Sequence, residues 1–278
     1  IIKIMKFKIL IIGKKSFIAQ NLHNYLRKKN FVTLKDFYDV IKKKKFFLKQ
    51  FNFIINCSID KKYINSKYNE KFDRDFIISK KIKSLNLKQI FFSTRKVYNS
   101  KMNISENDLL KPKCNYSKNK LITEKKLISN LGNRVLIFRI SNLIGYTKYN
   151  LKKKHKLFID IFFENIKQNI IFINGKSFKD FMHIDKFCEV VQKSIRKNIY
   201  GIYNLSIGKK VNLDRMISWL NKFNRKKKCI IFKKNKKNDS FYLNNKKLKS
   251  KVNFVYKISD LKKDCEKLSE QFFLKYEK

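Results

Sequence analysis

The chain has 278 residues, of which 43% are hydrophobic, so it is long enough for a substantial core and is not disordered by composition. Its formal net charge of +47 is extreme and suggests an anionic partner such as nucleic acid. The basic residues are mostly Lys and are spread along the whole chain. Because Arg is preferred for bidentate phosphate and base recognition, we interpret the charge as solvated surface and expect no specific nucleic-acid partner.

The cysteines and the hydropathy pattern point to a reducing compartment. The five cysteines are odd in number, widely spaced and form no CxxC pair, which argues against a disulfide framework and a zinc site. The longest apolar run near the start, at 9–12, is too short for the core of a signal peptide, and no stretch is long enough for a transmembrane helix. We therefore expect a cytoplasmic protein without a metal site or a transmembrane segment.

Strands and helices alternate over the first half of the chain. Apolar runs predict strands at 6–12, 31–34, 51–58, 88–94 and 135–142, and helical spacing of apolar residues predicts helices at 17–28, 37–50, 70–86 and 116–131. This alternation is typical of an α/β fold of the Rossmann-like, doubly wound type, with a mostly parallel sheet that is covered on both faces.

The pattern changes after Gly145. Helices are predicted at 151–170, 184–197, 212–223 and from about 259, with strands at 170–175, 202–208 and 229–233. We predict a dinucleotide-binding domain over 1–145, to which 179–205 returns, and a smaller α+β substrate-binding lobe over 146–278. The lysine runs at 42–45, 152–154 and 226–228 indicate solvated helix ends and loops.

The segment GKKSFIA lies between the first strand and the first helix and begins at Gly13. A pyrophosphate needs a close backbone approach and a helix N-terminus whose amides point at it. Gly13 allows the tight turn, the small Ala19 lets the helix pack on the sheet, and Ser16 stands where a second glycine is expected. The segment predicts a phosphate-binding turn, although strand–Gly–helix turns also occur in α/β proteins without this function.

Tyr116 and Lys120 are four residues apart on a predicted helix and therefore share one of its faces. An ammonium beside a phenol favours the phenolate and lowers the Tyr pKa from its usual value of about 10. Such a tyrosine can donate or accept a proton near neutral pH. The alternative is coincidence, since several Tyr-x-x-x-Lys pairs are expected by chance in a chain this rich in Tyr and Lys.

Ser93 and Thr94 end the fourth predicted strand. In an open parallel sheet, ligands bind beyond the carboxyl ends of the strands, where a hydroxyl can hydrogen-bond a substrate carbonyl. The alternative is that one of these hydroxyls caps the next turn.

Seven segments in this order resemble an extended short-chain dehydrogenase/reductase of the NAD-dependent epimerase/dehydratase type, over about residues 7–250. They are KILIIGKKSFIAQNL, FIINCS, FFSTRKVY, ENDLLKPKCNYSKNKLITE, VLIFRISNLIG, FKDFMHIDKF and GIYNLSIGKKVNL. The single proline, Pro112, falls on the family's proline. The resemblance implies an enzyme with an NAD or NADP cofactor and a nucleotide-sugar substrate, and we expect a homodimer.

The resemblance also assigns roles to residues. It makes Tyr116 the general acid/base and Lys120 the residue that lowers its pKa and holds the nicotinamide ribose. Thr94, three residues before Val97, takes the place of the catalytic Ser/Thr, with Ser93 as the backup. The cofactor-binding candidates are Gly13, Ser16, Phe17, Ile18, Ala19, Asp36, Asn56, Cys57 and Lys120, and the substrate-binding candidates are Arg95, Asn142 and Lys179.

The chain departs from the family pattern in three places. Ser16 replaces the second glycine and crowds the pyrophosphate, and Lys179 replaces an Arg and loses its bidentate geometry. The region 35–50 is short, so we expect one strand of the sheet to be missing. Asp36 then either ends the second strand and binds the adenosine ribose hydroxyls, which favours NAD, or belongs to a later motif.

The residues after Thr94 bear on the reaction. Dehydratases of the family carry an Asp-Glu pair there, whereas this chain has Arg95 and Lys96, so we expect a 4-ketoreductase or a 4-epimerase. The short length resembles the dTDP-4-dehydrorhamnose reductase branch, and the segment 179–181 resembles epimerases, so both reactions stay open. A dinucleotide-binding member without turnover and a basic protein that binds nucleic acid or another anionic surface are the alternatives.

Overall fold

The structure is a computed structural model, and it describes residues 6–145, 158–168, 170–174, 177–225, 230–234 and 240–275. The chain forms two compact units. Unit 1 comprises Ile1–Asn99, Glu106–Ile140 and Cys188–Asn204, and unit 2 comprises Ser100–Ser105, Ser141–Phe187 and Leu205–Lys278. No helix in the described part of the chain has both the length and the apolar character that crossing a membrane requires.

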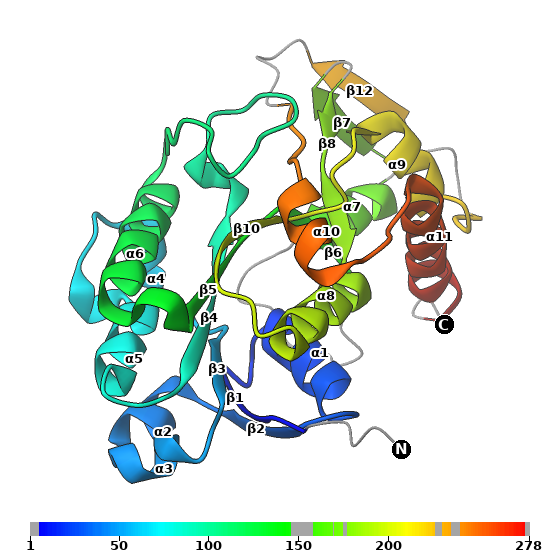
Figure 1. The fold of residues 1–278 in the computed structure, drawn as a ribbon. Coiled ribbons are helices and arrows are strands. Elements are labelled where there is room, and N and C mark those ends of the chain that lie inside the picture. The colour runs from blue at the N-terminus through cyan, green and yellow to red at the C-terminus, as the bar shows by residue number, and fades with distance from the viewer. Residues whose placement is uncertain are drawn as a thin grey trace. The chain divides into compact units, whose positions relative to one another are not determined.

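Unit 1 is built on a six-stranded sheet with the order β10-β5-β4-β3-β1-β2 (Figure 1). Its strands are β1 (Lys8–Ile12), β2 (Phe31–Lys35), β3 (Phe53–Asn56), β4 (Lys88–Thr94), β5 (Val135–Ile140) and β10 (Gly201–Leu205). The strands from β2 to β5 pair in parallel, and every residue of β3 and β5 is buried. These continuous apolar runs are buried on both sides of the sheet, which confirms the predicted doubly wound α/β fold.

The helices of unit 1 follow the predicted alternation. They are α1 (Phe17–Leu26), α2 (Phe37–Lys42), α3 (Lys45–Lys49), α4 (Lys61–Asn65), α5 (Arg74–Ile82), α6 (Asn115–Leu131) and the part of α8 (Ile184–Arg196) from Cys188 onward. The single helix predicted at 37–50 is two short helices, because Lys43 and Lys44 adopt extended backbone. No strand lies between β2 and β3, as the short region 35–50 predicted. In the strand order, β2 is at the edge of the sheet.

Among its described residues, unit 2 has three pairs of short strands. The pairs are β6 (Asn142–Ile144) with β9 (Phe181–His183), β7 (Ile170–Asn174) with β12 (Ile230–Lys234), and β8 (Phe178–Lys179) with β11 (Val211–Asn212). Its helices are α7 (Phe158–Lys167), α9 (Leu213–Leu220), α10 (Lys246–Val252) and α11 (Ile258–Lys275), besides the first residues of α8. The start of the helix predicted at 151–170, the lysine runs at 152–154 and 226–228, and residue 229 of the predicted strand 229–233 lie outside the described residues.

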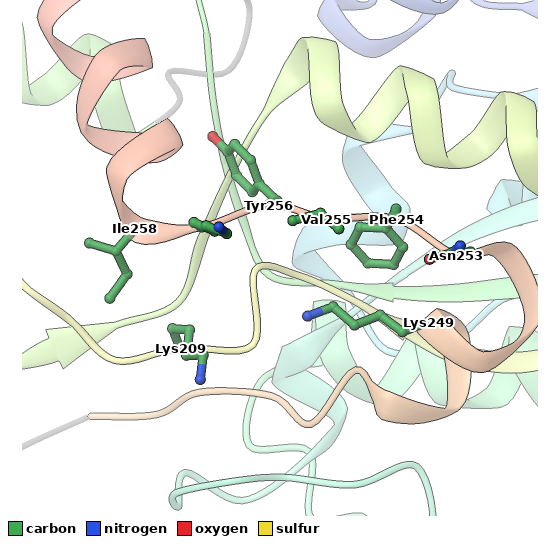
Figure 2. A pocket seen from close by; sticks show the side chains of 8 residues that line it. Lys209, Lys249, Asn253, Phe254, Val255, Tyr256 and Ile258 are labelled. Atoms are coloured by element: carbon green, nitrogen blue, oxygen red, sulfur yellow. The ribbon is translucent and has the colours of Figure 1, made fainter.

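A cavity of about 600 Å³ opens within unit 2 between α10 and the start of α11 (Figure 2). Phe254, Val255 and Tyr256 supply apolar surface, and Lys209 and Lys249 project from two separate segments. None of the residues predicted to form the site lines this cavity.

A buried ion pair fastens α6 to the sheet of unit 1. The Arg139 guanidinium on β5 donates from Nη2 to Glu124 Oε2 at 2.7 Å and from Nε to both carboxylate oxygens at 3.2 Å. The two side chains are 3% and 1% exposed. Ser93 Oγ also donates to Glu124, and Arg139 Nη1 donates to Tyr98 Oη at 2.8 Å. Each buried charge is thus paired and further hydrogen-bonded, which is the condition under which buried charges are tolerated.

Glu124→Gln should therefore destabilise the protein strongly, because it leaves the Arg139 charge buried without a counter-ion. We expect the free energy of unfolding to fall by about 3–5 kcal/mol in urea titrations. The matched control is Glu70→Gln, which removes a half-exposed carboxylate that binds Lys80 at 3.4 Å and Lys126 at 2.5 Å. Solvent screens these pairs, so the control should unfold like the unmodified protein. Equal effects of the two substitutions would contradict the assignment.

Candidate active site

Gly13 holds the carboxyl ends of β1 and β3 together. Its φ is +111°, and a Cβ on this residue would lie 3.0 Å from the amide nitrogen of Ser58 and 3.2 Å from the carbonyl carbon of Cys57. Both the backbone conformation and the space require glycine. Because β1 pairs with β2 on one side and β3 on the other, the strand order reverses here, and in open parallel sheets ligands bind at such a point.

Ser16 caps the N-terminus of α1. Its backbone is extended, with φ −82° and ψ 133°, and its amide donates to Gly13 O at 2.8 Å, which closes the turn. Its hydroxyl accepts from Ala19 N at 3.4 Å, and Ala19 is fully buried against the sheet. Phe17 and Ile18, both half-buried, form the first turn of the helix. The Ser16 side chain therefore uses an amide that a glycine would leave available to a phosphate.

Asp36 directly follows β2, beside this turn. Gly13 N donates to Lys35 O at 2.8 Å, and Lys14 N donates to Asp36 Oδ1 at 3.3 Å. The structure therefore places Asp36 at the end of the second strand, which is the first of the two positions considered from the sequence. Its carboxylate lies next to the predicted phosphate turn, where ribose hydroxyls of a dinucleotide would be expected.

Asn56 and Cys57 shape the loop after β3. Asn56 is buried, and its Oδ1 accepts from Ser58 N at 3.0 Å and Ser58 Oγ at 2.6 Å. Cys57 N donates to Ile12 O at 2.8 Å, which joins this loop to β1. Burial raises the pKa of the Cys57 thiol, and the nearby Asp75 raises this pKa further while Lys120 opposes the shift. Asn56 and Cys57 thus belong to the loop that lies against Gly13.

Tyr116 and Lys120 share one face of α6, which packs against β4. Lys120 is 7% exposed, and its Nζ donates to the carbonyl oxygen of Phe92 on β4 at 2.9 Å. The same Nζ lies 4.3 Å from the centroid of the Phe91 ring and 6.0 Å from that of Tyr116. The Lys120 ammonium is therefore anchored beside the Tyr116 ring. The residue that anchors it, Phe92, is two residues before Thr94 on β4.

Ser93 and Thr94 point to different environments, as successive residues of a strand do. Ser93 donates its hydroxyl to the buried Glu124 carboxylate. Thr94 Oγ1 accepts from Lys96 N at 3.2 Å and so caps the 3₁₀ turn Arg95–Val97. The capping alternative therefore holds for Thr94, but a hydroxyl that accepts from an amide still has its proton to donate. Thr94 is the better candidate for a substrate contact, because the Ser93 proton is used in the interior.

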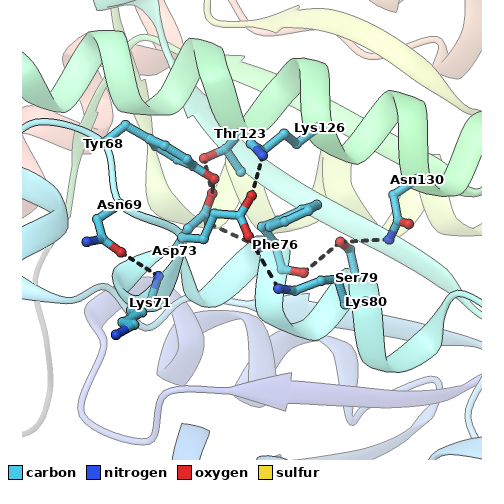
Figure 3. Close-up of polar contacts among 11 residues, drawn as sticks. Tyr68, Asn69, Lys71, Asp73, Phe76, Ser79, Lys80, Thr123, Lys126 and Asn130 are labelled. Carbon is cyan, nitrogen blue, oxygen red and sulfur yellow. Dashed lines mark hydrogen bonds and ion pairs between the residues drawn. The ribbon is translucent and has the colours of Figure 1, made fainter.

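A polar cluster that the sequence did not reveal holds α6 against α4 and α5. Figure 3 shows the part of this cluster around Asp73. Asp73 Oδ2 accepts from Tyr68 Oη at 2.9 Å and Thr123 Oγ1 at 2.6 Å, and Thr123 in turn bonds Tyr63 Oη at 2.6 Å. Asn119 Nδ2 donates to Tyr63 O at 2.7 Å. Asn119 and Thr123 lie four residues apart next to the Tyr116 face, which is the only signal in the sequence that could have indicated them.

The predicted substrate-binding residues are divided between the units. Arg95 lies in unit 1, in the turn that follows Thr94, whereas Asn142 and Lys179 belong to unit 2. Asn142 donates from Nδ2 to Asp180 O at 3.2 Å, and Lys179 Nζ lies 5.6 Å from the ring centroid of Phe241. The structure thus brings the predicted cofactor turn and the Thr94, Tyr116 and Lys120 group into one unit.

The family of the chain follows from comparison with known proteins. The model of the NAD dependent epimerase/dehydratase family matches residues 9–206. The chain belongs to this family. It is accordingly an NAD-dependent enzyme of the extended short-chain dehydrogenase type, and the Gly13 turn, the α1 N-terminus and Asp36 fit the dinucleotide.

Solved structures with the same fold cover nearly the whole chain. A UDP-N-acetylglucosamine 4-epimerase from Methanobrevibacter ruminantium is 16% identical, with a TM-score of 0.79 over 96% of this chain and 99% of that one. The Bordetella bronchiseptica enzyme WbmG, in complex with NAD, is 15% identical with a TM-score of 0.78, covering 99% and 96%. A dTDP-4-dehydrorhamnose reductase from Clostridium acetobutylicum is 19% identical with a TM-score of 0.72, covering 94% and 99%. No curated protein matches the sequence.

Ser16→Gly tests whether the cap competes with the cofactor. The substitution frees the Ala19 amide, so we expect NAD to bind several-fold more tightly, while stability falls by only about a few tenths of a kcal/mol. Ser16→Ala also frees the amide but removes the cap without glycine's freedom, and should cost about 1 kcal/mol of stability. NADH fluorescence titration and thermal unfolding measure the two effects. Weaker binding by Ser16→Gly would show that the hydroxyl supports the cofactor.

Proposed function

We propose that this protein is an NAD-dependent enzyme that reduces a 4-keto group or epimerises C4 of a nucleotide sugar. The observation that carries the proposal is the anchoring of Lys120 on the Phe92 carbonyl, beside Tyr116 and two residues before Thr94. Because β4 and α6 pack together, we place the substrate oxygen beyond the end of β4, between the hydroxyls of Thr94 and Tyr116.

In this proposal, Tyr116 moves the proton and Thr94 orients the oxygen that loses or gains it. Lys120 holds its positive charge beside the Tyr116 ring and would bind the nicotinamide ribose. When bound, the nicotinamide supplies the hydride acceptor or donor. The Lys120 ammonium is buried and lies over the Phe91 ring, which keeps water away from it. A charge that is poorly solvated acts more strongly on its neighbours.

Asp36 supports NAD rather than NADP as the cofactor. A carboxylate at the end of the second strand accepts hydrogen bonds from the ribose diol and repels a 2′-phosphate. The turn from Gly13 to Ser16 and the N-terminus of α1 would hold the pyrophosphate, with the loop of Asn56 and Cys57 beside them.

The two residues that follow Thr94 narrow the choice of reaction. Arg95 and Lys96 follow Thr94 where an eliminating enzyme needs an acid and a base, which disfavours dehydration. Ketoreduction and 4-epimerisation need only hydride and proton transfer, and both stay open.

We propose Arg95, Asn142 and Lys179 as substrate contacts and a homodimer as the assembly. The four described cysteines form no disulfide with one another, which supports a cytoplasmic location.

Tyr116→Phe should abolish turnover, because it removes the hydroxyl that moves the proton. NAD binding should persist within about twofold, because Lys120 stays in place. The assays are NADH oxidation with 4-keto nucleotide sugars and interconversion of 4-epimers, with the exposed Tyr200→Phe as the matched control. A fully active Tyr116→Phe would overturn the proposal. NAD binding without turnover of any nucleotide sugar by the unmodified protein would support the alternative that the enzyme has lost its activity.

Asp36→Ser should weaken NAD binding about tenfold and leave NADP binding unchanged or improved, because the ribose diol loses its acceptor and a 2′-phosphate loses a repulsive charge. Asp39→Ser is the matched control, since it removes an exposed acid three residues away. Fluorescence titrations with NADH and NADPH give both affinities. Unchanged NADH affinity in Asp36→Ser would place the adenosine ribose elsewhere.

A further inference from the structure

The Lys120 ammonium lies among aromatic rings as well as on the Phe92 carbonyl. Its Nζ is 4.3 Å from the ring centroid of Phe91, 5.8 Å from that of Tyr63 and 6.0 Å from that of Tyr116. A cation at such distances is attracted by the negative face of a ring, and more strongly where water is excluded. Lys120 is only 7% exposed, so the rings replace part of its hydration. Tyr63 has no part in the predicted site or in the proposed reaction.

The Tyr63 ring is fixed at its hydroxyl end. Tyr63 lies on α4 and is 4% exposed, and its Oη is 2.6 Å from Thr123 Oγ1 on α6. Thr123 directs its single proton to Asp73 Oδ2 at 2.6 Å and to Asn119 O at 3.0 Å. The Tyr63 hydroxyl is therefore the donor to Thr123, and the ring cannot swing away without breaking a buried hydrogen bond.

A second contact fixes the backbone of Tyr63 to the same helix. Asn119 Nδ2 donates to Tyr63 O at 2.7 Å and to Ser66 O, at the end of α4, at 2.9 Å. Asn119 directly precedes Lys120 and Thr123 follows it by three residues, so the bonds to α4 come from both sides of the lysine along α6. The Tyr63 ring is thus held in one position relative to the ammonium.

Phe91 supplies a second ring, from the sheet. It is fully buried on β4, directly before Phe92, whose carbonyl oxygen accepts from Lys120 Nζ at 2.9 Å. That bond uses one of the three N–H donors of the ammonium, and within the described part of the chain no other acceptor bonds Nζ. Rings attract a cation without accepting its protons along a fixed line, so two N–H groups are left for a ligand.

We propose that Tyr63 is a positioning residue, whose ring forms with that of Phe91 an aromatic seat that holds the Lys120 ammonium in place for the cofactor ribose. This inference rests on the proposed role of Lys120 at the ribose. It makes cofactor affinity depend on the charge distribution of these two rings and not only on their shape.

Fluorination separates the attraction of a ring from its packing, because fluorine withdraws charge from the face of the ring and changes its shape little. Tyr63→Phe keeps the ring, loses the hydroxyl and serves as the reference, and it should unfold at a lower temperature than the unmodified protein. Phenylalanines with one, two and three fluorine atoms at this position should then weaken NADH binding stepwise, to about fivefold for three. Fluorescence titration with NADH gives the affinities.

Tyr256 in unit 2 is the matched control. It is 5% exposed, its hydroxyl donates to Asp264 Oδ2 at 2.6 Å, and Lys186 Nζ lies 5.9 Å from its ring centroid. The same fluorinated series at this position should change stability at most and leave NADH affinity as it is. Equal NADH affinity along the series at position 63 would overturn the proposal, because a merely structural ring depends on shape alone.

The series in a Lys120→Ala background tests whether the seat acts through the ammonium. There the fluorine atoms should have no effect on NADH affinity, and an effect that persists would overturn the proposal. If Tyr63→Phe does not fold, the same series at Phe91 replaces it, since it changes no hydrogen bond, and a flat affinity there would overturn the seat. Failure of the proposed reaction would show separately, as normal NADH binding without turnover. If the unmodified protein bound no NADH, both proposals would fall together.

Discussion

The geometry of the site depends on a buried ion pair that fixes one face of α6 against the sheet. Tyr116, Lys120 and Glu124 are spaced four residues apart and therefore lie along one line on the helix. Glu124 binds Arg139 on β5, and this bond leaves the helix little freedom to rotate. The rotation that satisfies Glu124 is the one that brings Lys120 to the Phe92 carbonyl and places Tyr116 beside it. A charge pair at one end of the line thus determines the geometry of the chemistry at the other.

The cofactor side of unit 1 has its own constraint in the contact between two strand ends. The absence of a Cβ on Gly13 lets the loop after β3 approach closely, since a Cβ there would lie 3.0 Å from Ser58 N, and a hydrogen bond from Cys57 N to Ile12 O closes the contact. The loop so formed carries Asn56, whose Oδ1 accepts hydrogen bonds from the amide and the hydroxyl of Ser58. A side chain at Gly13 would therefore displace the loop that carries Asn56 and Cys57.

Local patterns in the sequence predicted what depends on local physics. The five strands of the first half are continuous apolar runs, and their positions agree with the structure to within a few residues. The strands β8 and β11 have only two residues each and form because their partners are near, so no periodicity reveals them. The role of Asp73 could not be predicted from the sequence, because its donor Thr123 reaches it only when α5 packs against α6. The position of Asp36 stayed ambiguous in the sequence because the missing strand removed the usual spacing, and only the pairing of β2 with β1 resolved it.

The charge imbalance sharpens the role of the few acids. Many lysines lie over aromatic rings at the surface, as Lys126 does at 4.6 Å and Lys80 at 4.9 Å from the Phe76 ring. Their stems cover apolar surface while their charges stay in water, so lysine can accumulate there at little cost. The acids that are buried among the described residues, Asp73, Asp75, Glu124 and Asp180, have no such freedom. Glu124 lies on α6 and pairs with Arg139, and Asp73 on α5 accepts from three donors, one of which is Thr123 on α6. In so basic a chain, the negative charges kept in the interior are those that a buried cation or a set of buried donors stabilises, and the pair of Glu124 and Arg139 is the one that fixes the helix of Tyr116 and Lys120 on the sheet.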